Sequence, residues 1–411
     1  MPTRRDTVIG LSALPLAFTP GGCANTHGPI RDDARLEPGR AFVLRRGGET
    51  VVSDLGGHAF GMPFTADRPF RVASISKAFV AEAVRALKRD GVVTGTEDAA
   101  RIDPRLRHPE HADAPITLDH LIRHRSGLRD PAVYWMAAPG DIRELIAPEI
   151  FEPGARPGKA FRYSNFNYGL AATLLELVTG ERFDRIVQRT VLAPLGLEAG
   201  FNWAGVGRAR RMTGMPLLRG APGAWEVQID ARDTLRDDAP AVLHEDGWTA
   251  DAYVPGRNGT LFSPQGGLRA SVNDLLAFGE RVLLADPTLW EPGWVWDGRL
   301  GRPTASNAGE TPGEATGSGP SEGGHFVAFG DGLYIYPADR SPIPGVRLVG
   351  HHGEAYGLFA GLWIAPDHDA VFVHADLGSA PDGPARTDGV PENTVLAQHA
   401  FDRAGALLRS G

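Results

Sequence analysis

Ser74 and Lys77 are the residues of this sequence whose types and spacing best suit covalent chemistry. They form a Ser-x-x-Lys motif at the start of an apolar run that predicts a helix, where positions i and i+3 share one face. A serine hydroxyl becomes nucleophilic when a neighbouring base removes its proton. A lysine amine can be that base if burial or nearby positive charge lowers its pKa. The motif therefore indicates acyl transfer, with the helix N-terminus favouring a developing oxyanion.

The Ser-x-x-Lys motif also has a purely structural interpretation. Such motifs arise by chance in many helices, as an N-cap serine followed by a solvated lysine. Ser76 is a second candidate for the helix cap, because serine and threonine favour helix starts. The chemical interpretation therefore depends on residues further along the chain.

A second motif, Tyr163-x-Asn165, lies in a predicted loop. A tyrosine phenol beside a lysine ammonium can lose or relay a proton, because the positive charge favours the phenolate. An asparagine amide can donate to an acyl carbonyl and accept from a lysine. Tyr-Ser-Asn alone is a common loop tripeptide, so its value depends on lying near Ser74 and Lys77.

A third motif, His351-x-Gly353, lies in a segment that we predict to be a turn between two strands, residues 350–357. Glycines in such a turn let the backbone approach a ligand closely. A histidine there can hydrogen-bond the tyrosine or a substrate. The structural alternative is a turn with solvent-exposed histidines.

His120 and His124 have the i, i+4 spacing that suits a metal, but no third ligand lies nearby in the sequence. We interpret them as part of a structural helix end, with Thr117 as N-cap and Gly127 as helix stop. The single cysteine and the absence of a His-Glu-x-x-His pattern give no support for a zinc site. We expect neither a metal nor an organic cofactor.

The hydrophobic pattern predicts strands at both ends of the chain. Two apolar runs around a Gly-Gly turn indicate a β-hairpin, and several short runs indicate strands near the C-terminus. Each group needs the other to complete a sheet. The predicted strands and final helix are residues 41–44, 50–52, 332–336, 347–349, 361–364, 370–374 and 392–408.

Composition narrows the class of protein. The 411 residues suffice for one large domain or two modest ones, and a hydrophobic fraction of 42% allows a sizeable core. The formal net charge of −8 argues against general nucleic-acid binding. We therefore expect a globular protein without a nucleic-acid partner.

Residues 1–22 have the features of an export signal: Arg4 and Arg5, then a short apolar run, then small residues. The arginine pair resembles a twin-arginine signal, with an ordinary Sec signal as the alternative. Cys23 follows small residues as in a lipoprotein cleavage site, or is an incidental cysteine. Residues 23–38 read as a tether before a catalytic domain at 39–411. We expect an exported protein, periplasmic or anchored to the membrane through lipidated Cys23.

The three motifs, in this order, resemble the serine β-lactamase and penicillin-binding-protein superfamily, specifically its class C β-lactamase-related branch. Supporting segments are His-x-Ser-Gly-Leu at 124–128, Glu-Pro-Gly at 152–154 and Pro-x-Gly-Gly-Leu at 264–268. The resemblance covers roughly residues 35–408. It implies an α+β, β-lactamase/transpeptidase-like fold: an antiparallel sheet flanked by helices, with a mostly helical subdomain inserted at about 85–260.

The resemblance also implies roles for the motif residues. Ser74 would be the nucleophile that forms an acyl-enzyme. Lys77 and Tyr163 would together act as general acid and general base. Which of the two carries the proton in each step is left open. Asn165 would orient Lys77 and the substrate. The oxyanion hole would be two backbone amides, those of Ser74 and Glu354.

His351 departs from the family pattern, because β-lactamases and transpeptidases carry lysine in the corresponding Lys-Thr/Ser-Gly motif. A histidine is mostly neutral at pH 7 and offers a carboxylate no permanent charge. Losing a charge-assisted contact costs about 1.5–3 kcal/mol, roughly ten- to a hundredfold in recognition. Among relatives of this branch, the His351-x-Gly353 pattern resembles that of esterases and peptidases more than that of efficient β-lactamases.

The resulting hypothesis is a serine hydrolase that acts on an ester or amide, with little β-lactam turnover. Its substrate would be a small molecule or derived from peptidoglycan. One alternative is a peptidoglycan D-Ala carboxypeptidase or D-aminopeptidase, and another is a class C-like β-lactamase. A third is a non-catalytic sensor that traps an acyl group on the same scaffold.

Overall fold

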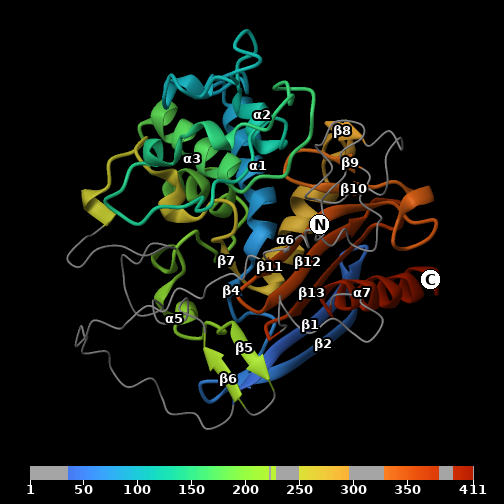
Figure 1. Ribbon diagram of the computed structural model, residues 1–411. Coiled ribbons are helices and arrows are strands. Elements are labelled where there is room, and N and C mark those ends of the chain that lie inside the picture. Colours follow the sequence, from blue (N-terminus) through green and yellow to red (C-terminus); the bar gives the residue numbers. More distant parts are fainter. Residues whose placement is uncertain (1–35, 222–223, 228–249, 296–327, 379–391, 411) are drawn as a thin grey trace, which may run out of the picture.

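The computed structural model describes residues 36–221, 224–227, 250–295, 328–378 and 392–410 (Figure 1). The predicted export signal, Cys23 and nearly all of the tether lie outside these residues. Among the described helices, none is long and apolar enough to cross a membrane.

One large antiparallel sheet joins the two ends of the chain, as the sequence predicts. Its strand order is β3-β2-β1-β13-β12-β11-β10-β9-β8. The N-terminal hairpin pairs directly with a C-terminal strand, for example Val43 with Val373. The strands are β1 Glu37–Arg46, β2 Glu49–Ala59, β3 Met62–Pro63, β8 Trp294–Val295, β9 Ala328–Phe329, β10 Tyr334–Tyr336, β11 Leu348–Ala355, β12 Leu358–Ala365 and β13 Ala370–Asp376.

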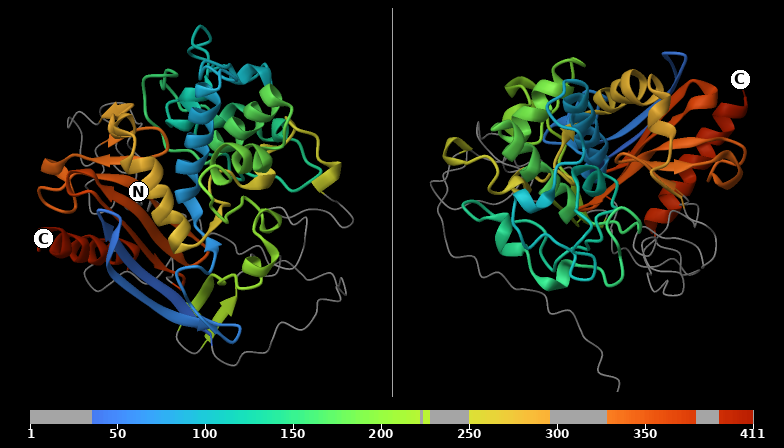
Figure 2. Two further views of the ribbon diagram at one scale, coloured as in Figure 1. Left: turned by 180° about the vertical axis from the view of Figure 1, so that it is seen from behind. Right: turned by 90° about the horizontal axis from the view of Figure 1, so that it is seen from above.

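The central strands are buried on both faces, and this explains why β12 is apolar throughout its length. Leu362 and neighbouring residues pack into one core with α6 (Val272–Phe278). Trp363, the next residue in the strand, packs into another core with α7 (Glu392–Arg409). Helices therefore cover both faces of the sheet (Figure 2).

A mostly helical part lies between β4 (Phe70–Arg71) and β7 (Arg269–Ala270), with α1 as its link to the sheet. Residues of α1 such as Phe79 pack into the core against the sheet, whereas Val84 packs into the helical core. The other elements here are η1 Ala73–Ile75, α1 Ser76–Arg89, η2 Ala99–Arg101, α2 Leu118–Ile122, η3 Ile142–Leu145, η4 Pro148–Ile150, α3 Phe166–Thr179, α4 Phe183–Val187, η5 Gln188–Leu192, η6 Trp203–Gly205, α5 Arg208–Arg211, β5 Leu218–Ala221, β6 Ala224–Val227, η8 Ala250–Ala252 and η9 Gly259–Phe262.

One predicted helix end and one predicted turn differ from the structure. Thr117 caps α2 as expected, but the helix ends at Ile122, before the predicted stop at Gly127. The segment 350–355 is not a turn, because β11 continues through it to Ala355. The reversal occurs at Tyr356 and Gly357, which both have positive φ. Gly350 and Gly353 instead belong to a strand whose backbone closely approaches other backbone, and this context produces the same sequence signal as a turn.

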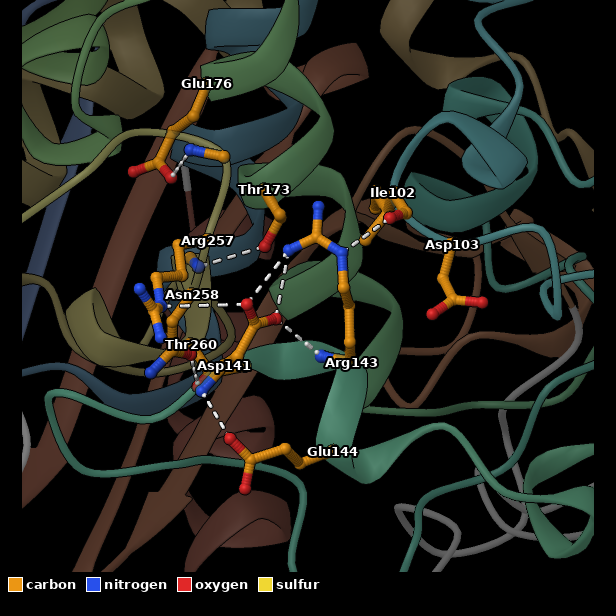
Figure 3. A network of polar contacts seen from close by, with 12 residues as sticks. Ile102, Asp103, Asp141, Arg143, Glu144, Thr173, Glu176, Arg257, Asn258 and Thr260 are labelled. Atoms are coloured by element: carbon orange, nitrogen blue, oxygen red, sulfur yellow. Dashed lines mark hydrogen bonds and ion pairs between the residues drawn. The ribbon is translucent and has the colours of Figure 1, made fainter.

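Buried polar groups on α3 hold the segment that precedes β7 (Figure 3). The Glu176 carboxylate accepts hydrogen bonds from the Tyr253 hydroxyl at 2.5 Å and the Gly256 amide at 2.9 Å. The Thr173 hydroxyl accepts one from the Gly259 amide at 2.9 Å. Burial raises the pKa of Glu176 to about 7. These contacts fix the approach to Gln265, whose carbonyl reaches the candidate site.

Candidate active site

Ser74 lies in η1, the short turn directly before α1, and therefore at the N-terminal end of the helix, where the sequence predicts it. Ala73 has φ +48°, a conformation that non-glycine residues adopt only when the surroundings enforce it. Ser76 enforces it: its hydroxyl donates to the Ala73 carbonyl at 2.6 Å and accepts from the Leu268 amide at 3.0 Å. The Ser76 side chain therefore stabilises the turn and does not cap the helix. Ser74 remains partly exposed.

Lys77 is fully buried at the start of α1, and its amine joins three parts of the chain. Its Nζ lies 2.9 Å from Ser74 Oγ, 2.9 Å from Asn165 Oδ1 and 2.8 Å from the Gln265 carbonyl. Burial lowers the pKa of Lys77 to about 7, against a smaller opposing effect of the Asp130 carboxylate. A substantial fraction of Lys77 is therefore the neutral amine at neutral pH.

The contacts of Lys77 suit proton removal from Ser74. A neutral amine has two hydrogens and one lone pair. The Asn165 and Gln265 oxygens can only accept, so they take the two hydrogens. The lone pair is then directed at the Ser74 hydroxyl, which is the geometry of a general base and its nucleophile.

Two tyrosine rings flank the Lys77 amine, at 4.9 Å for Tyr163 and 5.4 Å for Tyr168 from Nζ to the ring centroid. The Tyr168 hydroxyl donates to the Ile122 carbonyl at 2.9 Å, and burial raises its pKa well above the usual value. Tyr168 is thus a structural neighbour. The structure brings the predicted Tyr163 to the side of Lys77.

His124 supports the Tyr163–Asn165 segment. Its Nδ1 accepts a hydrogen bond from the Ser164 amide at 3.1 Å, and its ring lies 4.2 Å from that of Tyr163. Burial and the Lys77 charge lower the pKa of His124 well below its usual value. His120 instead belongs to the cap of α2. Within the described ranges, no group of His, Cys, Asp or Glu residues could hold a metal ion.

β11 brings the third motif against the Ser74 turn. It pairs with β12 from Val349 to Ala355 but with β10 only up to Gly350. Beyond Gly350 the strand lies against η1, and a Cβ added at Gly353 would lie 2.3 Å from the Val72 carbonyl oxygen. Glycine is required here for close backbone approach. The backbone that approaches Gly353 is that of Val72, on a strand and not in a turn, and the close approach to a ligand stays a prediction.

His351 is buried beside the tyrosines, with its ring 6.2 Å from Tyr163 and 4.7 Å from Tyr334. Its Nδ1 donates to the His352 carbonyl, which leaves Nε2 as the bare nitrogen of a neutral ring. Burial and the Lys77 charge lower the pKa of His351 to about 3. No described residue hydrogen-bonds Nε2. His351 therefore offers the site an acceptor and no cation.

The predicted oxyanion donor Glu354 follows Gly353 on the same strand, paired in register with Phe359. Its side chain is exposed, so the predicted role belongs to its backbone amide alone. Nearby, the Arg71 guanidinium lies 4.9 Å from the centroid of the half-exposed Tyr356 ring. A half-exposed aromatic ring thus lies against Arg71, which precedes Ser74 by three residues in the chain.

Two contacting residues were not predicted as site residues. Gln265 contributes only its main-chain carbonyl, which its side-chain type does not reveal. Asp130 binds three consecutive residues, 164–166, through hydrogen bonds of 2.8 to 3.0 Å. Its only sequence signal is its place two residues after the His-x-Ser-Gly-Leu segment. An isolated aspartate in a loop has no pattern that would single it out.

Sequence comparison places the chain among known proteins. The sequence model of the family described as Beta-lactamase matches residues 31–387. A D-aminopeptidase of Cereibacter sphaeroides (strain KD131 / KCTC 12085) is 25% identical over 90% of this chain and 67% of its own length. Esterase EstB of Burkholderia gladioli is 26% identical over 59% of this chain and 65% of its own length. A D-aminopeptidase of Gluconobacter oxydans (strain 621H) is matched over only 32% of its length.

Structural comparison agrees on the fold. The class C β-lactamase from Rhodobacter sphaeroides superposes with a TM-score of 0.60 at 15% sequence identity. The match covers 90% of this chain and 95% of that structure. The expected β-lactamase/transpeptidase-like fold, with its antiparallel sheet and flanking helices, is therefore confirmed.

Proposed function

The chain belongs to the β-lactamase family and is a serine hydrolase, and we propose that it forms an acyl-enzyme at Ser74 from an ester or amide substrate. The observation that carries this proposal is the contact of Lys77 Nζ with Ser74 Oγ at 2.9 Å. The lowered pKa of Lys77, about 7, supports the same role, because a base works best when its pKa lies near the operating pH.

The proposed reaction has two halves. In the first, neutral Lys77 takes the Ser74 proton as Oγ attacks the substrate carbonyl, and the backbone amides of Ser74 and Glu354 stabilise the oxyanion. The proton passes through Lys77 or Tyr163 to the leaving oxygen or nitrogen as the carbon–heteroatom bond breaks. In the second half, a water molecule loses a proton to the same base and attacks the acyl carbonyl. Ser74 regains a proton when the acid product leaves.

The neutral state of His351 supports the proposed substrate class. A ring whose pKa lies at about 3 carries no charge at pH 7, so it does not supply the carboxylate contact that a lysine would. Esters and amides do not require that contact. The names of two relatives, a D-aminopeptidase and an esterase, fit amide and ester cleavage respectively. Peptidoglycan-derived amides are the second candidate class, favoured by the D-aminopeptidase match.

Export remains part of the proposal and is supported by the sequence of residues 1–23 alone. A periplasmic or lipid-anchored enzyme would meet peptidoglycan fragments. Mass spectrometry of the mature N-terminus from expressing cells tests this point. A diacylated Cys23 would support anchoring, and an intact Met1 would contradict export.

A substrate panel tests the proposed reaction. We expect kcat/KM for nitrophenyl butyrate or D-alanine nitroanilide to exceed that for a chromogenic cephalosporin by about ten- to a hundredfold, because His351 carries no charge. A cephalosporin value equal to the best ester value would contradict the argument from His351. A stable adduct without turnover would favour the acyl-trapping sensor.

A further inference from the structure

We infer that Asp130 is a positioning residue for this acyl transfer: its carboxylate orients the Asn165 amide so that the Lys77 lone pair is directed at Ser74. The inference rests on the proposed roles of Ser74 and Lys77 and adds to them a residue that contacts neither. Its evidence is a continuous chain of hydrogen bonds.

The Asp130 carboxylate organises the loop that carries the second motif. Its Oδ1 accepts from the Ser164 hydroxyl at 2.8 Å and from the Phe166 amide at 2.8 Å. Its Oδ2 accepts from Asn165 Nδ2 at 3.0 Å. Phe166 is the first residue of α3, and the Asn165 side chain does not cap that helix. Asp130 thus fixes Asn165 and the start of α3 together, at a helix end that favours negative charge.

The bond to Asp130 determines which end of the Asn165 amide faces Lys77. A side-chain amide can rotate by half a turn with little change in shape, which exchanges its oxygen and its nitrogen. A carboxylate can only accept, so the amide nitrogen must face Asp130. The oxygen is then the atom that lies 2.9 Å from Lys77 Nζ.

Amide orientation in turn controls the orientation of the Lys77 amine. With the Asn165 oxygen in place, two acceptors hold the two hydrogens of the neutral amine, and the lone pair points at Ser74. With the amide reversed, its NH2 group would face Lys77 and compete for the lone pair. Asp130 therefore acts on the nucleophile through two intervening side chains.

The charge of Asp130 also acts on Lys77. Tyr163, Tyr168, His124 and His351 face Lys77 from the surrounding elements, and both histidines are neutral because their pKa values are lowered. Among the described residues, no ion pair holds Asp130, so its charge remains available to stabilise the lysine ammonium. Removing that charge must lower the pKa of Lys77.

The test compares Asp130→Asn with Asp130→Glu, which keeps the charge. Asp54→Asn is the matched control, because it removes one carboxylate on exposed β2. The chain has three lysines, 77, 88 and 159, so the Lys77 signal of 13C-lysine-labelled full-length protein can be assigned with Lys77→Met. Its pKa is then read from the NMR titration, and the pH profile of kcat/KM is measured with nitrophenyl butyrate.

For Asp130→Asn we expect the pKa of Lys77 to fall by about one unit. The acid limb of the kcat/KM profile, where activity falls as the pH decreases, should move to lower pH by the same amount, because the Lys77 amine loses its proton at lower pH. The plateau should fall at least tenfold, because the lone pair is no longer directed at Ser74. Asp130→Glu should retain the wild-type limb, and Asp54→Asn should match wild type in all respects.

The inference would be overturned if the folded Asp130→Asn protein kept the wild-type pKa of Lys77 and the wild-type acid limb of the kcat/KM profile. A fall in the plateau of kcat/KM alone would not support it, since loss of a purely structural residue would have that effect. If Asp130→Asn does not fold, Asp130→Glu provides the test. A shift of its acid limb by about one pH unit, as large as that expected for Asp130→Asn, would overturn the inference. Ser74→Ala separates the two proposals. Retained turnover in that variant would refute Ser74 as nucleophile, while the NMR result would still decide the role of Asp130.

Discussion

Replacing Lys77 with methionine is expected to lower kcat/KM for the best ester about 10³-fold, within the range for loss of a general base. Methionine fills a similar volume without an amine, so the buried site stays packed. The Ser74 hydroxyl would lose the group that takes its proton, 2.9 Å away. Steady-state kinetics with nitrophenyl butyrate measures the change.

The pH dependence of the wild-type enzyme provides the second half of this prediction. The ammonium form of Lys77 cannot accept a proton, so kcat/KM should fall tenfold per pH unit below a pKa of about 7. Lys88→Met is the matched control, because Lys88 lies at the other end of α1 in an ion pair with Asp119. Activity of Lys77→Met within tenfold of wild type, or an acid limb below pH 5, would contradict the assigned role.

Acidification is expected to unfold the protein between about pH 6.5 and pH 4, because several histidines are buried in neutral form. Burial lowers the pKa of His351 and of His374 to about 3, and those of His124 and His352 are lowered well below the usual value. A folded-state pKa below the unfolded value gives stability that is present above pH 6.5 and is lost as the pH falls toward 3. A shift from 6.5 to about 3 corresponds to about 5 kcal/mol for each group. Two such groups approach the whole stability of a typical domain.

His374 allows this explanation to be tested away from the candidate site. It lies on β13 beneath α7, with its ring 6.1 Å from that of His352. His374→Gln removes one buried titratable group. Between pH 7 and pH 4.5, the free energy of unfolding of this variant should therefore decrease by about 2–3 kcal/mol less than that of wild type. Urea unfolding at a series of pH values measures that difference. His399→Gln, at an exposed position of α7, should leave the dependence unchanged. Equal pH dependence in wild type and His374→Gln would refute the account.

The sequence predicts the contacts that follow from regular periodicity. The i, i+3 spacing placed Lys77 beside Ser74, although Ser74 itself lies in the preceding 3-10 turn. Strand patterns at the two ends of the chain predicted the shared sheet, because each edge needs a partner. The resemblance to the class C branch supplied the association of Tyr163, Asn165 and His351 with that pair, which local pattern could not.

Other features depend on contacts between loops and leave no periodic signal. Asp130 and the Gln265 carbonyl reach the site from segments far apart in the sequence, so neither residue type reveals its partner. Gly353 was assigned to a turn, because a glycine needed for close approach to Val72 has the same sequence signature. A neutral His351 at pH 7 was expected from the ordinary pKa of histidine, whereas the lowering of that pKa to about 3 depends on complete burial, which three-dimensional packing determines.

Mass spectrometry after acid quenching shows whether Ser74 is the residue that becomes acylated. Wild type, Ser74→Ala and the exposed-site control Ser53→Ala are mixed with nitrophenyl butyrate, quenched and digested. We expect a butyryl increment on the peptide that contains Ser74 in wild type and Ser53→Ala. Ser74→Ala should show neither adduct nor turnover. A butyryl group on another residue that persists in Ser74→Ala, together with retained turnover, would contradict the account.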